Sequence, residues 1–153
     1  MSSGVFIAVS LLLMLGACAE EAPSVEDTQR IVVIKDGEGI HYAHGCAFYE
    51  LRDLLWEGVG DSSKQKGMPD TPFFEVRLIG KSGVSTVNVG DHWVSTAGGV
   101  TLLTAATYAR ILKLVEKRRS GGVPESKIEK SVQAALSEIQ RPTYVEENRC
   151  PQR

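Results

Sequence analysis

The sequence predicts an α+β fold in which helices cover one face of an antiparallel sheet. Apolar, β-branched segments occur in pairs separated by glycine-containing turns, and amphipathic segments of helical period follow them. Strands joined by such short turns run antiparallel, because a parallel pair needs a crossover of about a dozen residues or more. Strands and helices in separate runs are typical of α+β proteins.

The first unit is a predicted hairpin followed by a helix. Segments 30–36 and 39–44 are apolar and β-branched, and glycines between them favour a turn. Segment 47–56 carries apolar residues at positions i, i+3 and i+7, which predicts an amphipathic helix. Gly58 and Gly60 predict the end of this helix.

The second unit has the same order with an extra short hairpin. Segments 73–80 and 84–90 predict one hairpin, and segments 92–96 and 100–103 predict another. A helix is expected next, so the succession suggests a ββα repeat with one more helix at its C-terminal side.

Two amphipathic helices complete the predicted domain, which spans residues 29–141. Thr104 is expected to cap the first helix, because its hydroxyl can accept a hydrogen bond from the first turn. Pro124 suits the first turn of the second helix, which is expected to end before Pro142. Residues 142–153 are then a C-terminal tail.

The N-terminal residues predict a signal peptide and a tether. The apolar run 4–17 has about 14 residues, whereas a membrane-spanning helix needs roughly 20, and it ends in small residues. The segment 19–27 is acidic and poor in large apolar residues, which is typical of a flexible segment.

The residues Leu15-Gly16-Ala17-Cys18 resemble the lipobox of bacterial lipoproteins, and the resemblance covers residues 1–18 only. It implies that the signal peptide 1–17 is removed and that Cys18 is lipidated, with palmitate among the usual acyl chains. Residues 18–28 would then tether the domain to a membrane. Because Ala19 follows the cysteine instead of aspartate, the resemblance implies the periplasmic face of the outer membrane. The alternative is a plain signal peptide with a chance cysteine.

Lipidation of Cys18 would leave an even pair of cysteines, Cys46 and Cys150, in an oxidising periplasm where disulfides persist. A bond between them would close a loop of about 100 residues, worth at most about 4–5 kcal/mol in the chain-entropy model. It would also pin the C-terminal tail. Two free thiols are the alternative.

The charge pattern argues against a nucleic-acid partner. The net charge is −2, and the basic and acidic residues are interspersed without a basic stripe that could follow a phosphate backbone.

The polar loop 58–72 is the predicted binding surface, because it is long and has little to bury. Its candidate contact residues are Asp61, Lys64, Lys66, Met68 and Asp70. A tolerated insertion is the alternative interpretation, since the entropic cost of a loop grows slowly with its length.

No motif predicts catalysis, a metal site or a cofactor. His41 and His44 would point to opposite faces of one strand, and with Cys46 they do not make the four-ligand set of a closed zinc site. Asp91 and His92 are adjacent, and on a strand they would also point to opposite faces.

Ser63-x-x-Lys66 and Lys81-Ser82-Gly83 superficially resemble motifs of penicillin-binding proteins, but lie in a predicted loop and a hairpin turn.

These observations predict a non-enzymatic, lipid-anchored periplasmic domain that binds a protein or an envelope component. Inhibitors of wall-degrading enzymes and immunity proteins are examples of that class. The alternative is an accessory subunit with a structural or assembly role in an envelope complex. A small periplasmic enzyme is a third hypothesis, which would require a cleft that gathers a histidine and an acid.

Overall fold

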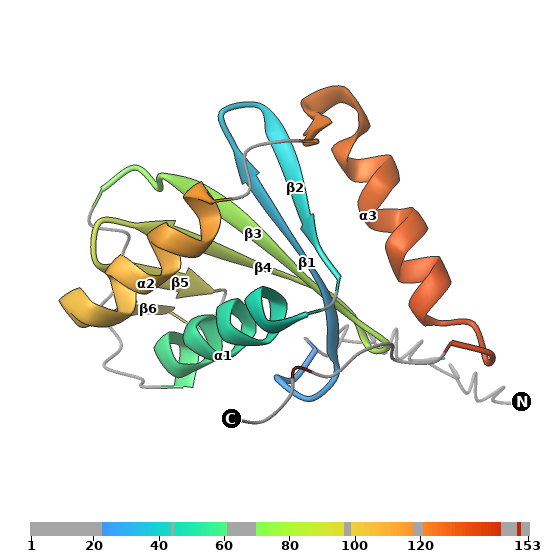
Figure 1. Cartoon of the computed structure of the whole chain (residues 1–153), viewed down its shortest axis with the longest axis horizontal. Coiled ribbons are helices and arrows are strands. Elements are labelled where there is room, and N and C mark those ends of the chain that lie inside the picture. The colour runs from blue at the N-terminus through green and yellow to red at the C-terminus, as the bar shows by residue number, and fades with distance from the viewer. Residues whose placement is uncertain are drawn as a thin grey trace, which may run out of the picture.

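The computed structural model describes residues 23–43, 45–60, 70–96, 99–117, 121–144 and 150, without the side chains of residues 58–60. Within these ranges the chain forms a seven-stranded antiparallel sheet and three helices, which confirms the predicted α+β class (Figure 1). The strands are β1 (Thr28–Lys35), β2 (Glu38–Tyr42), β3 (Phe74–Gly80), β4 (Gly83–Gly90), β5 (Trp93–Thr96), β6 (Gly99–Leu102) and β7 (Val123–Pro124). The helices are α1 (Cys46–Gly60), α2 (Ala105–Glu116) and α3 (Glu125–Ile139).

The strand order is β6-β5-β4-β3-β1-β2-β7, so β1 lies inside the sheet between β3 and β2. The β1–β2 hairpin turns at Asp36 and Gly37, which have φ angles of 52° and 78°. Two consecutive positive φ angles are the requirement of a type I′ turn, whose twist matches that of the flanking strands. The short strand β7 pairs with β2, and the sequence analysis did not predict it.

One face of the sheet is covered by α1 and α2. Alternate strand residues point to this face and meet the apolar sides of both helices. The resulting core contains seventeen buried side chains: Ile31, Val33, Tyr42, Phe48, Leu51, Leu54, Leu55, Phe74, Val76, Leu78, Val87, Val89, Val94, Leu103, Tyr108, Ile111 and Val115. This is the main core of the described chain.

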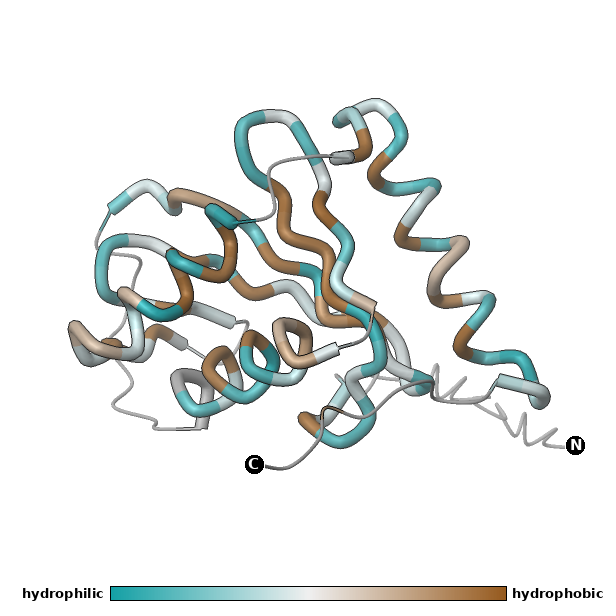
Figure 2. Tube along the Cα trace, viewed as in Figure 1, coloured by the Kyte–Doolittle hydropathy of each residue, from teal (hydrophilic) through white to brown (hydrophobic). Residues whose placement is uncertain are grey.

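The opposite face is covered by α3, so the prediction that the helices cover one face was wrong. Val32 and Ile79 on the sheet pack with Ile128, Val132, Ala135 and Ile139, in a second and smaller core. Figure 2 shows the corresponding hydrophobic positions recurring along α3. The physical reason lies in β1, where Ile31, Val32 and Val33 are all fully buried. Consecutive apolar residues on a strand point to both faces, so both faces need a cover.

The predicted N-cap of α2 is confirmed, whereas Pro124, predicted in the first turn of α3, lies just before that helix in β7. The Thr104 hydroxyl accepts a hydrogen bond from the Thr107 amide at 3.1 Å, as expected of the N-cap of α2. The helix predicted over 47–56, with Gly58 and Gly60 at its end, is longer in the structure, where α1 spans Cys46–Gly60 and includes both glycines. A glycine costs only about 1 kcal/mol in a helix. The packing of the preceding turns through Leu51, Leu54 and Leu55 can outweigh that cost.

Asp27, where the predicted tether joins the sheet, caps the β3–β4 turn. Its carboxylate accepts hydrogen bonds from the amides of Lys81 and Ser82, at 3.0 and 3.1 Å, and from the Ser82 hydroxyl. Partial burial alone would raise the pKa of Asp27. The hydrogen bonds from Ser82 and Lys81, together with the Lys81 charge, outweigh this effect, so the pKa of Asp27 is lowered. The Lys81-Ser82 motif is therefore a structural turn, as expected.

No helix in the described residues is long and apolar enough to cross a membrane.

We predict that Gly90→Ala destabilises the protein through a steric clash with Trp93. A Cβ at Gly90 would lie 2.0 Å from Cε2 of the buried Trp93 indole, and Gly90 does not have a positive φ that would add strain. The free energy of unfolding should fall by about 1–3 kcal/mol, the usual cost of overpacking. Urea denaturation measures it. In a Trp93→Val background the same substitution should cost much less, and an equal cost in both backgrounds would contradict the clash.

Candidate functional site

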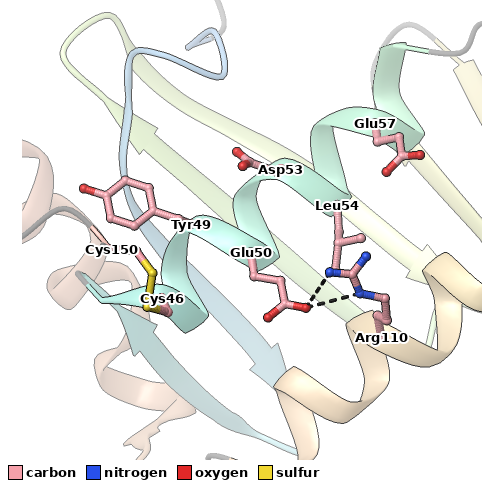
Figure 3. A pocket seen from close by; sticks show the side chains of 8 residues that line it. All are labelled: Cys46, Tyr49, Glu50, Asp53, Leu54, Glu57, Arg110 and Cys150. Atoms are coloured by element: carbon pink, nitrogen blue, oxygen red, sulfur yellow. Dashed lines mark hydrogen bonds and ion pairs between the residues drawn. A yellow bond between two sulfur atoms is a disulfide. The ribbon is translucent and has the colours of Figure 1, made fainter. Parts of the chain in front are cut away.

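A surface hollow of about 590 Å³ lies between α1, α2 and the C-terminal Cys150 (Figure 3). Eight residues line it: Cys46, Tyr49, Glu50, Asp53, Leu54, Glu57, Arg110 and Cys150. Six of them come from α1, where spacings of three and four residues place them on one side of the helix. The hollow is therefore built mainly by one helix whose other side packs into the main core.

The framework of the hollow is fixed by a disulfide between Cys46 and Cys150, with a Cα–Cα distance of 4.8 Å. The bond joins the first residue of α1 to the C-terminal tail across 104 positions of the sequence. Closing a loop of this length stabilises the folded state by up to about 4–5 kcal/mol in the chain-entropy model. The two cysteines that the sequence analysis paired are thus joined, and they form one end of the hollow.

An ion pair spans the hollow from α1 to α2. Arg110 donates to one Glu50 oxygen from Nη2 at 2.8 Å and from Nε at 3.2 Å (Figure 3). The Glu50 and Arg110 side chains are 39% and 59% exposed, so the pair contributes no more than about 1 kcal/mol to stability. Its effect is mainly to hold the two side chains in one orientation.

The hollow is acidic in balance. Glu50, Asp53 and Glu57 supply three carboxylates, and Arg110 is the one cationic side chain of the lining. Arg52 lies beside it, with its Nε 3.0 Å from an Asp53 oxygen and its guanidinium 5.0 Å from the centroid of the Tyr49 ring. Carboxylates spread along one helix side favour a cationic group in the hollow over an anionic one.

The disulfide removes thiol chemistry from this lining. Both sulfur atoms are joined in the disulfide, so neither is a thiolate nucleophile or a metal ligand. The remaining lining residues offer carboxylates, a guanidinium, a phenol and one leucine. Such a set can recognise a polar or cationic segment by charge and hydrogen bonds.

The predicted binding loop lies almost wholly outside the described residues. Asp61, Lys64, Lys66 and Met68 belong to the part that the structure does not describe, and Cys18 does too. Asp70 is described and exposed, four residues before β3. Because α1 extends to Gly60, the first three residues of the expected loop are helical instead.

The predicted absence of a metal site rested on His41, His44 and Cys46, of which His44 is outside the described residues. Cys46 is oxidised. In the part of the chain that the structure describes, no three His, Cys, Asp or Glu residues are grouped to hold a metal ion.

The expectation that Asp91 and His92 point apart was wrong. The Asp91 Oδ1 atom lies 2.7 Å from the His92 Nδ1 atom, because the two residues form the turn between β4 and β5 and His92 has a φ of 60°. The His92 ring also lies 4.4 Å from the Tyr108 ring, between centroids. Burial, and then the Asp91 charge, raise the pKa of the Tyr108 phenol.

This Asp–His pair resembles the orienting half of a catalytic relay, in which a carboxylate fixes the imidazole. Activation also requires a nucleophile hydrogen-bonded to the other ring nitrogen. Among the described hydrogen bonds, none joins His92 to a serine, threonine or cysteine. The pair is therefore described as part of the surface turn between β4 and β5.

A serine–histidine contact occurs under α3, where the Ser131 Oγ atom lies 2.6 Å from the His41 Nε2 atom. This is within the range of a nucleophile and its base. Burial first, and then the positive charge of Arg30, lower the pKa of His41. A general base must become an imidazolium, which a carboxylate stabilises and a neighbouring arginine destabilises. The contact therefore has the wrong electrostatics for nucleophile activation.

Comparison with known proteins found no matching family model, no matching curated protein and no matching solved structure.

Proposed function

We propose that this chain is a lipid-anchored domain of the bacterial cell envelope that binds a protein or another envelope component. The observation that carries the binding role is the acidic hollow between α1 and α2. Inhibition of a hydrolase and immunity to a toxin are functions of this type. The role of an accessory subunit in an envelope complex remains the alternative.

The hollow supports recognition because its walls are held in place before any partner arrives. The disulfide fixes one end, and the main core fixes α1 and α2 beneath it. A preorganised surface loses little conformational entropy when it binds, so more of the contact energy appears as affinity. Three carboxylates face one arginine in the lining, and although Glu50 is paired with Arg110 and Asp53 with Arg52, the acidic excess at Glu57 favours a partner segment that carries lysine or arginine.

The envelope location rests on the lipobox-like residues Leu15-Gly16-Ala17-Cys18 and is supported by the disulfide. Disulfides persist in oxidising compartments such as the periplasm and are rare in the cytosol. Stable anchoring needs more than one acyl chain, and a triacylated N-terminal cysteine meets that requirement.

We predict that labelled palmitate enters the wild-type chain and is lost in Cys18→Ser. The thiol that would carry the diacylglycerol is absent from that variant, and cleavage at the lipobox depends on it. Fluorography of the immunoprecipitated protein measures the label. Cys46→Ser is the matched control and should keep the label; incorporation that survives Cys18→Ser would rule out this anchor.

We predict that reversing the charge of two carboxylates of the hollow weakens partner capture. In Asp53→Lys with Glu57→Lys, a cationic partner segment would meet like charges, and affinity should fall by about tenfold or more. The full-length protein would be used to capture partners from detergent-solubilised envelopes, with quantitative mass spectrometry as the readout.

The matched control is Glu116→Lys with Glu129→Lys, which changes the net charge equally at exposed positions outside the lining. Proteins captured by the wild type and this control, but lost from the hollow variant, would support the site. Equal capture by both variants would show that the hollow is not the binding surface. Capture of a resident envelope complex through the same residues would favour the accessory-subunit role.

A further inference from the structure

Helix α3 covers its face of the sheet alone, over a core that is separate from the main core. In the described residues its core holds six buried side chains, against seventeen in the main core. Helix α3 is also the last element in chain order. The two-residue strand β7, which directly precedes it, pairs with β2 at the edge of the sheet. Elements with few buried apolar contacts open at lower free energy than the rest of a protein. Helix α3 is therefore the element that can detach while the main core stays intact.

A half-buried polar contact lies beside this small core. His41 on β2 pairs across the strands with Val32, one of the two sheet residues of the α3 core. Its Nε2 atom lies 2.6 Å from the hydroxyl of Ser131, which is on α3 between Ile128 and Val132. A neutral imidazole that carries its proton on the other ring nitrogen accepts a hydrogen bond from this hydroxyl, and the bond ties the helix to the sheet.

Burial, and then the positive charge of Arg30, make the protonation of His41 unfavourable. Arg30 on β1 points to the same face, and its side chain is only 16% exposed. It is held by the Tyr144 hydroxyl at 2.7 Å, by the Ala43 carbonyl at 3.4 Å and by Glu138 of α3 at 3.6 Å. Glu138 and Tyr144 thus keep the guanidinium in place under the helix, and Arg30 is the charge that acts on His41.

We propose that the His41–Ser131 contact is an acid-sensitive latch, which holds α3 on the sheet at neutral pH and loosens it when His41 is protonated. An imidazolium would place a second positive charge beside Arg30 in a half-buried site. Releasing α3 hydrates that charge, and it also uncovers the apolar strip around Val32 and Ile79. The main core lies on the other face and does not depend on this contact.

The direction of the pH effect follows from the pKa of His41. Burial and Arg30 lower this pKa in the closed state, below the ordinary value of 6.5 that the released residue regains. His41 therefore binds a proton more tightly when α3 is released than when α3 is attached. The attachment of α3 has its full strength only above pH 6.5, where His41 is neutral in both states. Attachment weakens as the pH falls below 6.5, by up to about tenfold per pH unit, until the lowered pKa is passed.

Amide hydrogen exchange of the full chain tests the latch between about pH 5 and pH 8, where histidine titrates. After correction for the intrinsic exchange rate, peptides from α3 should lose protection below pH 6.5, while peptides from β3 keep theirs. In His41→Gln, whose amide can still meet Ser131 but does not titrate, protection of α3 should not depend on pH. Equal pH dependence in wild type and variant would overturn the proposal, as would a joint loss of protection in α3 and β3.

Ser131→Ala separates the latch from a general effect of mutation at His41. It removes the contact but leaves His41 and Arg30, so α3 should be less protected at neutral pH than in the wild type. NMR titration of His41 in the wild type gives a readout that requires no variant. An apparent pKa at or above 6.5 would overturn the proposal.

Discussion

The fold depends on one constraint, the burial of β1 on both of its faces. Ile31 and Val33 point to one side of the sheet and Val32 to the other, and none of the three is exposed. A single layer of helices can cover only one of these sides. The chain therefore places α1 and α2 on one face and brings α3 back to the other (Figure 1). This arrangement makes β1 the partition between two separate cores.

The two cores divide the molecule into parts with different properties. The main core fixes α1 and α2 firmly, and the disulfide ties the C-terminal tail to the start of α1, so the acidic hollow stands on the rigid part. The smaller core relies on polar contacts from His41 and Arg30 to complete the attachment of α3. The proposed binding surface and the proposed latch therefore lie on opposite faces of one sheet.

Local patterns in the sequence were enough to predict the hairpins, the N-cap at Thr104 and the three helices, because each depends on neighbouring residues. The face that α3 covers could also have been inferred, since apolar residues at 31–34 run without alternation. The hollow could not be predicted from local patterns, because Arg110 contacts Glu50 across 60 positions of the sequence. The acidic spacing on α1 was its only local signal. The contact between Asp91 and His92 was missed because both residues were assigned to a strand. In the structure they form a turn, whose geometry brings the two side chains together.

The central claim is that β1 separates two cores, and methyl NOE spectroscopy of the full chain tests it most directly. The Val32 methyl groups should show NOEs to Ile128 or Val132 of α3 and none to α1. The Val33 methyl groups should show the reverse pattern, with NOEs to side chains of the main core and none to α3. NOEs from Val32 to α1, or the absence of any NOE from Val32 to α3, would contradict the two-core account.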